Sequence, residues 1–95
     1  METNCEILKH IPIHPETISG KDLAWVAGLN SSAQVRRHIN ALRIAGYPII
    51  SGADGYSIAT NSEQIEKCIH SLRSRCASIE EAIYGLYKSF GAIAQ

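Results

Sequence analysis

The most regular feature of the sequence is a run of apolar side chains in its C-terminal third. These side chains recur at alternating intervals of four and three residues: Ile65, Ile69, Leu72, Cys76, Ile79, Ile83, Leu86, Phe90 and Ile93. This spacing places them along one stripe of an α-helix and is the heptad pattern of a coiled coil. We therefore expect residues 61–95 to form a coiled-coil-like C-terminal oligomerisation helix.

A helix of roughly thirty residues is a rod about 45 Å long, which one small domain is too short to cover. The stripe therefore predicts a homo-oligomer. Its interface would consist of Ile65, Ile69, Leu72, Cys76, Ile79, Ile83, Leu86 and Phe90. Isoleucine at several d positions disfavours a plain parallel dimer, so the order and orientation of the oligomer stay open. Because Ser78-x-x-Glu81 also matches a helix start, a helical hairpin is an alternative to one continuous helix.

One motif that is typical of helix starts occurs at four places in the sequence. In this motif, a capping side chain is followed three residues later by an acid or an amide. The four are Thr3-x-x-Glu6, Ser19-x-x-Asp22, Ser31-x-x-Gln34 and Asn61-x-x-Gln64. The first side chain accepts an unpaired backbone N–H, and the second reaches back toward the cap. Gly28 and Gly46 provide the left-handed conformation that ends a helix. We expect helices over residues 4–10, 20–27, 32–45 and from about 62 onward.

After Gly46 the apolar pattern changes to a period of two. Pro48-Ile49-Ile50 and Tyr56-Ser57-Ile58 flank a glycine-bearing loop, which predicts a two-stranded β-hairpin. Thr17-Ile18 is a candidate for a brief additional strand. The predicted fold class is mainly α with a small β-hairpin. Residues 1–60 form the first domain, and residues 61–95 form the C-terminal helix.

Two short helices joined by a glycine turn and followed directly by a hairpin form the winged helix-turn-helix pattern. Residues 20–58 resemble the winged helix-turn-helix DNA-binding domain of the biotin-operon-repressor type, as in small phage and prophage proteins. The matching segments are Lys21-Asp22-Leu23-Ala24, Ala27-Gly28-Leu29, Val35-Arg36-Arg37-His38-Ile39, Leu42-Arg43, Gly46-Tyr47-Pro48-Ile49 and Gly55-Tyr56-Ser57-Ile58. The resemblance implies a domain that binds double-stranded DNA, and a phage origin.

Charge is distributed unevenly although nine basic and nine acidic residues sum to zero. Residues 31–60 carry three arginines against Asp54 alone, so a local positive region lies on the predicted third helix. Arg37 and Asn40 lie opposite the apolar stripe of this helix and Gln34 lies on a flank. The groups suited to base edges are Gln34, Arg37 and Asn40. The groups suited to phosphates are Lys21, Ser31, Ser32, Arg36 and Arg43.

Cysteine usage indicates a reducing compartment. The three cysteines are Cys5, Cys68 and Cys76. They are odd in number and share no C-x-x-C spacing, so we expect reduced thiols in a cytoplasmic protein. A metal site built from Cys5, His10 and His14 is an alternative. Pro12 and Pro15 argue against it, because they would break the single helix needed to align these ligands.

Other function classes are disfavoured by what the sequence lacks. No nucleophile–base pair, paired acid or phosphate-binding loop is present, so we expect a protein without enzymatic activity, cofactor, metal or small-molecule substrate. The longest apolar run is about three or four residues, too short for a membrane span or a signal-peptide core.

We expect sequence-specific binding of double-stranded DNA by a phage-type transcriptional regulator that acts as a dimer or higher oligomer. One alternative is a phage DNA-packaging recognition subunit. Another is a winged-helix module for protein–protein interaction without DNA binding, which the neutral charge, Asp54 at the wing tip and the outward-facing Ile44 favour. We expect Ile44 to pack against the wing or the last helix. Trp25 is expected to pack in the core or between helices.

Overall fold

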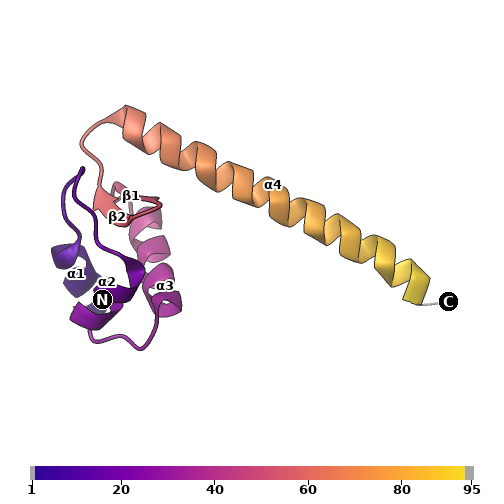
Figure 1. The fold of residues 1–95 in the computed structure, drawn as a ribbon, viewed down its shortest axis with the longest axis horizontal. Helices are drawn as coiled ribbons and strands as arrows, with labels where there is room; N and C mark the ends of the chain where they lie inside the picture. The colour runs from indigo at the N-terminus through magenta and orange to yellow at the C-terminus, as the bar shows by residue number, and fades with distance from the viewer. Residues whose placement is uncertain (1, 94–95) are drawn as a thin grey trace. The chain divides into compact units, whose positions relative to one another are not determined.

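The protein is described by a computed structural model that covers the backbone of residues 2–93 and the side chains of residues 6–91. Its elements, in chain order, are α1 (Glu2–His10), α2 (Gly20–Val26), α3 (Ser32–Ile44), β1 (Ile49–Gly52), β2 (Gly55–Ile58) and α4 (Ser62–Ile93) (Figure 1). The predicted fold class is confirmed: a mainly helical chain with a helix-turn-helix, a small hairpin or wing, and a long C-terminal helix.

The chain divides into two compact units, Met1–Ile65 and Glu66–Gln95. The first contains the three short helices, the hairpin and the first turn of α4, and the second contains the rest of α4. Within the described residues, no helix is both long enough and apolar enough to cross a membrane.

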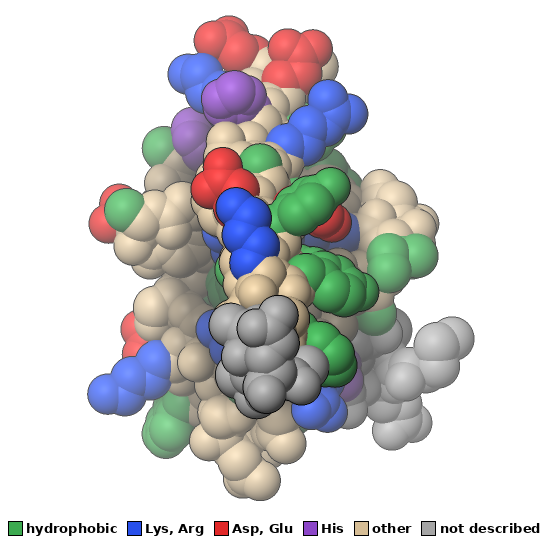
Figure 2. All heavy atoms as spheres, turned by 90° about the vertical axis from the view of Figure 1, so that its right-hand side faces the viewer, with side chains coloured by type: hydrophobic (Ala, Val, Ile, Leu, Met, Phe, Trp, Pro, Cys, Tyr) green, Lys and Arg blue, Asp and Glu red, His purple; other side chains and the backbone are tan. Residues whose placement is uncertain are grey.

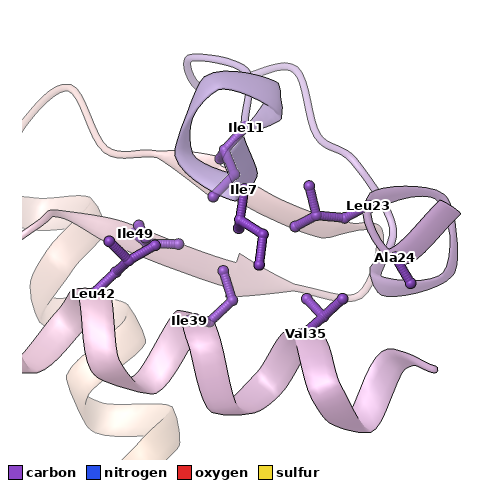
Figure 3. Packing of buried hydrophobic residues seen from close by; sticks show 8 residues of the cluster. All are labelled: Ile7, Ile11, Leu23, Ala24, Val35, Ile39, Leu42 and Ile49. Carbon is purple, nitrogen blue, oxygen red and sulfur yellow. The ribbon is translucent and has the colours of Figure 1, made fainter. Parts of the chain in front are cut away.

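The core of the first unit lies where α1, α2, α3 and the hairpin meet (Figure 3). Helix α3 contributes Val35, Ile39 and Leu42, whose spacing of four and three residues aligns them on one face. Opposite them lie buried side chains from the other elements: Ile7, Ile11, Leu23, Ala24 and Ile49. Because α3 buries a single face in this core, its opposite face stays in solvent.

Helices α2 and α3 end in the same way, with a glycine just past the last turn. Gly28 has φ 72° and Gly46 has φ 102°, a region that favours glycine. In α3, the Gly46 N–H donates to Arg43 O at 3.0 Å and the Tyr47 N–H donates to Leu42 O at 3.1 Å. These two bonds form the Schellman motif, and the corresponding pair closes α2. The predicted glycine stops are therefore confirmed.

Three of the four predicted helix starts are observed. Ser19 Oγ accepts from the Asp22 N–H at 3.1 Å, Ser31 Oγ from the Gln34 N–H at 3.4 Å, and Asn61 Oδ1 from the Gln64 N–H at 3.0 Å. The expected start at Thr3 is wrong, because α1 begins at Glu2 and Thr3 lies inside it. The side chain of Thr3 lies outside the described part of the chain, and helix boundaries inferred from local pattern commonly shift by one or two residues.

The hairpin turn is shorter than the five residues that separate the two predicted runs, which end at Ile50 and begin at Tyr56. Ile49 pairs with Ile58 and Gly52 with Gly55, which leaves only residues 53 and 54 in the loop. The expected strand at Thr17-Ile18 is reduced to a single bridge, in which Ile18 and Tyr56 exchange both backbone hydrogen bonds at 2.8 and 3.0 Å. This bridge brings the segment before α2 directly against β2.

Helix α4 is continuous over 32 residues, so the alternative of a helical hairpin at Ser78 is wrong. The first turn of α4, which belongs to the first unit, is held there by Gln64. Its Nε2 lies 3.0 Å from His14 Nδ1, and its Oε1 accepts from the Thr60 N–H at 2.8 Å. The side chain of Ile93, the last residue of the predicted stripe, lies outside the described residues.

Candidate nucleic-acid interface

The candidate interface is the face of α3 that points away from the core. Arg36, Arg37 and Asn40 are exposed on this face, while Val35, Ile39 and Leu42 on the other face hold the helix in place. Helix α3 contains no acidic residue. The geometry therefore presents two guanidinium groups and a carboxamide on a helix whose orientation is set by buried side chains.

Arg36 and Arg37 keep their donors available. Among the described residues, neither side chain forms a hydrogen bond or an ion pair. An uncommitted guanidinium presents five N–H donors, in a fork that matches phosphate oxygens or the acceptors of guanine. These two side chains therefore have the strongest capacity for anion or base contacts on α3.

Ser31 and Gln34 are partly engaged in starting the helix. Besides the capping bond from the Gln34 N–H to Ser31 Oγ, Gln34 Oε1 accepts from the Asn30 N–H at 2.8 Å. Gln34 is half-buried, whereas Ser31 and Ser32 are exposed. The hydrogen bond from the Asn30 N–H to the amide oxygen of Gln34 would have to break before that oxygen could contact a base. Ser31 and Ser32 lie at the helix N-terminus, where backbone N–H groups favour anions.

Arg43 joins α3 to the hairpin. Its Nε donates to Ile49 O at 2.8 Å and one terminal nitrogen donates to Ser51 Oγ at 3.2 Å, both on β1. The side chain is half-buried. Sequence reasoning assigned Arg43 to phosphates and missed this role. Two features of the sequence could have indicated these bonds to β1: Arg43 lies beside the apolar stripe of α3, and it is only six residues before Ile49.

The remaining predicted contacts lie on neighbouring elements. Lys21 is exposed on α2, and like Arg36 it forms no hydrogen bond or ion pair with any described residue. Asp54 is exposed in the two-residue loop of the wing. The wing tip therefore presents an acid rather than a cation to any polyanion that approaches it.

Among the described residues of the first unit, the two most exposed large apolar side chains are Trp25 on α2 and Ile44 on α3, and only the outward position of Ile44 was expected. Trp25 is 83% exposed on α2, so the expectation that it packs in the core or between helices is wrong. It follows Ala24 on α2, and the buried face of this short helix is filled by Leu23 and Ala24. Ile44 is 80% exposed at the end of α3 and does not pack against the wing.

The predicted oligomerisation residues share one stripe of α4, but they differ in exposure. Ile65 and Leu72 are half-buried, and the other positions are exposed: Ile69, Cys76, Ile79, Ile83, Leu86 and Phe90. Figure 2, which looks along α4 from its C-terminal side, shows hydrophobic side chains gathered along one side of the helix. Tyr84 and Tyr87 are exposed near the same end. The described part of the chain leaves this stripe uncovered over its last four turns.

Among the described residues, no group of three histidine, cysteine or acidic side chains could hold a metal ion. The side chain of Cys5 lies outside the described part. Comparison of the chain with models of protein families, with curated proteins and with solved structures finds no match.

Proposed function

We propose that this chain binds double-stranded DNA in a sequence-specific manner through a winged helix-turn-helix of the biotin-operon-repressor type, and acts as a phage-type transcriptional regulator. The observation that carries the proposal is the solvent face of α3, with uncommitted Arg36 and Arg37, exposed Asn40 and no acid. In this mode of binding, the second helix of the motif enters the major groove.

Arg37 and Asn40 are the base-reading residues of this proposal. They are three residues apart, so they lie about one helical turn from each other on the exposed face. Arginine matches the paired acceptors of guanine, and asparagine matches the donor and acceptor of adenine. Each such bidentate contact distinguishes the correct base by about 1–3 kcal/mol.

Arg36 and Lys21 are the phosphate-contacting residues, with Ser31 and Ser32 at the start of α3 as neutral partners. Each neutralised phosphate contributes about −0.9 to the slope of log affinity against log salt. Two cationic contacts therefore predict a slope of about −1.8 for each copy of the chain. Because the whole chain is neutral, only this local arrangement can produce that dependence.

The test is fluorescence anisotropy of a labelled random-sequence duplex, titrated with the protein at several salt concentrations. We expect affinity to fall as salt rises, and Arg36→Ala to make the slope less negative by about 0.9. Asn40→Ala should leave binding to the random duplex unchanged, and it should weaken binding to a duplex selected for high affinity.

Lys88→Ala is the matched control, because Lys88 is an exposed cation on α4, far in sequence from α3. It should change neither the affinity nor the salt slope. Absence of binding even at low salt would overturn the proposal, and so would an equal effect of Lys88→Ala and Arg36→Ala.

A homo-oligomer formed through α4 is the second part of this proposal. Its support is the uncovered stripe, in which Leu86 is 70% and Phe90 is 73% exposed. Two copies would double the number of contacts with DNA, so a neutral chain could bind a site tightly. Sedimentation equilibrium over a range of concentrations measures this association independently of DNA.

One observation favours a different function, a protein–protein interaction module that keeps this fold without binding DNA. Exposed tryptophan is unusual on a monomer surface, whereas buried tryptophan is enriched at the centres of interfaces. Trp25 is therefore a candidate anchor for a protein partner. If the duplex does not bind, Trp25 rather than Arg37 becomes the residue to follow.

A further inference from the structure

We propose that α4 pairs with α4 of a second copy in antiparallel orientation, in the register that places Cys76 opposite the partner's Ile79. The same register places Leu72 opposite the partner's Ile83, and Ile69 opposite the partner's Leu86. This inference rests on the proposed self-association and adds its orientation and register. It does not depend on DNA binding.

The occupant of the stripe must have the same length and the same spacing as α4. From Ile65 to Phe90 the stripe covers about 38 Å of helix, with alternating steps of four and three residues. Knobs-into-holes packing requires a partner helix with that same alternation. A second α4 meets this requirement, because every side chain of the stripe then has a counterpart at matching height.

Packing selects the antiparallel orientation. In a parallel pair in register, each residue of the stripe meets its own copy, so two small Cys76 side chains would form one layer and two Phe90 side chains another. Such layers leave a void and an overcrowded site in the same interface. Reversing one helix places small Cys76 against the partner's Ile79, and large Phe90 against the partner's Ile65, which evens out the layers.

The β-branched residues of the stripe lead to the same orientation. In the heptad, Ile79 occupies a d position and Ile83 an a position. Isoleucine at d disfavours a two-stranded parallel coiled coil. In an antiparallel pair, residues at the a positions of one helix pack against residues at the d positions of the other. Ile79 therefore does not have to adopt the packing of a parallel pair, which isoleucine at d disfavours.

Charge selects the register. Arg73 and Glu80 lie one heptad apart on the same edge of the stripe, and both are exposed. In the proposed register, Arg73 lies beside the partner's Glu80, and the symmetry repeats the pair. Sliding one helix by a heptad would bring Glu80 beside the partner's Glu80 in one direction, or Arg73 beside the partner's Arg73 in the other. Either shift replaces two attractions with repulsion between like charges.

The two orientations predict different distances between equivalent residues. Ser78 lies near the centre of the proposed pair, so the two Ser78 residues are at nearly the same height along the axis. The distance between them is therefore only the width of the pair, about 20–25 Å when their outward-pointing side chains are included. The two Lys88 positions are additionally separated by about 31 Å along the axis. In a parallel pair in register, both positions would be separated by the same short distance.

The test is electron–electron dipolar spectroscopy on spin-labelled Ser78→Cys and Lys88→Cys, each in the full chain with Cys5, Cys68 and Cys76 replaced by alanine. We expect a short distance for Ser78→Cys and one of about 35 Å or more for Lys88→Cys. Sedimentation equilibrium first verifies that the background still associates. Two short distances would overturn the antiparallel orientation, and no dipolar signal at associating concentrations would overturn the pair.

A second measurement uses the unmodified chain and does not depend on those substitutions. Under mild oxidation, a parallel pair in register would form a Cys76–Cys76 disulfide, whereas the proposed pair has Cys76 facing isoleucine. We expect peptide mapping to find no such disulfide, and its rapid formation would overturn the proposal. The absence of any association by sedimentation would instead remove the proposed oligomer, and duplex anisotropy would still test DNA binding by itself.

Discussion

In the unit Met1–Ile65, the large apolar side chains Ile7, Leu23 and Ile39 are covered by other parts of that unit, whereas in the unit Glu66–Gln95 more than half of Ile79 and Leu86 is exposed. The buried set Val35, Ile39 and Leu42 on α3 has the same spacing of four and three residues as Ile79, Ile83 and Leu86 on α4, so local pattern does not distinguish them. The difference lies in how far each set is covered. The first unit has its own core, whereas the stripe of the second unit is exposed from Cys76 to Phe90.

The same contrast holds for polar signals. Ser31-x-x-Gln34 and Ser78-x-x-Glu81 have the same capping pattern, yet Ser31 starts α3 and Ser78 lies in the interior of α4. Ser31 is preceded by a glycine turn, whereas Ser78 is preceded by sixteen residues of uninterrupted helix. A capping side chain is effective only where the preceding backbone has left the helical conformation.

The largest expected effect comes from the core of the first unit. Ile39→Ala should lower the free energy of unfolding by about 2–5 kcal/mol, because it removes buried methyl groups and leaves a cavity. Leu86→Ala removes similar groups from the exposed stripe and should leave the unfolding of the first unit within about 0.5 kcal/mol. Urea unfolding, at a concentration too low for association, measures both. Equal losses would contradict the contrast between the two units.

The next effect compares two glycines. A side chain at Gly55 would clash with Ile18 O, and Gly55 has φ 135°, so Gly55→Ala should cost about 1–3 kcal/mol. Gly85 lies inside α4 with nothing near the added carbon, so Gly85→Ala should stabilise that helix by about 0.5–1 kcal/mol. Urea unfolding of the first unit and amide hydrogen exchange along α4 report the two changes. A stabilising Gly55→Ala would show that β2 does not approach Ile18 this closely.

The smallest effect compares the two serines. Ser31→Ala removes the acceptor for the Gln34 N–H and should cost about 1 kcal/mol. Ser78→Ala replaces a helix-interior serine with a better helix former, and should stabilise α4 by a few tenths of a kcal/mol. Urea unfolding of the first unit measures the effect of Ser31→Ala, and amide hydrogen exchange along α4 measures the effect of Ser78→Ala. If Ser78→Ala destabilised α4 by as much as Ser31→Ala destabilises the first unit, a helix start at Ser78 would have to be reconsidered.

Much of the fold could be predicted because its signals are local. Serine and asparagine caps, glycine stops and the apolar stripe of α3 each act within one or two helical turns, so the sequence located α2, α3 and α4 closely. The candidate interface was predictable to the same extent: once one face of α3 is buried, Arg36, Arg37 and Asn40 must be exposed.

The positions that were not predicted depend on segments distant in sequence. Trp25 is exposed because the narrow buried face of α2 is already filled, which its own neighbours in sequence do not reveal. Arg43 is committed to β1 because the Schellman turn at Gly46 returns the chain alongside α3. In both cases, the outcome depends on which element occupies the adjacent space.

The sequence by itself determined where α2, α3 and α4 begin, that glycines end α2 and α3, which face of α3 is buried, and that α4 carries a continuous apolar stripe. Only the tertiary structure decided that Gly55 lies against Ile18, that Arg43 joins α3 to the wing, and that the hairpin turns in two residues. The physical reason is range. Capping and helical periodicity depend on residues a few positions apart, whereas close approach and hydrogen bonding between elements depend on how separate segments meet in space.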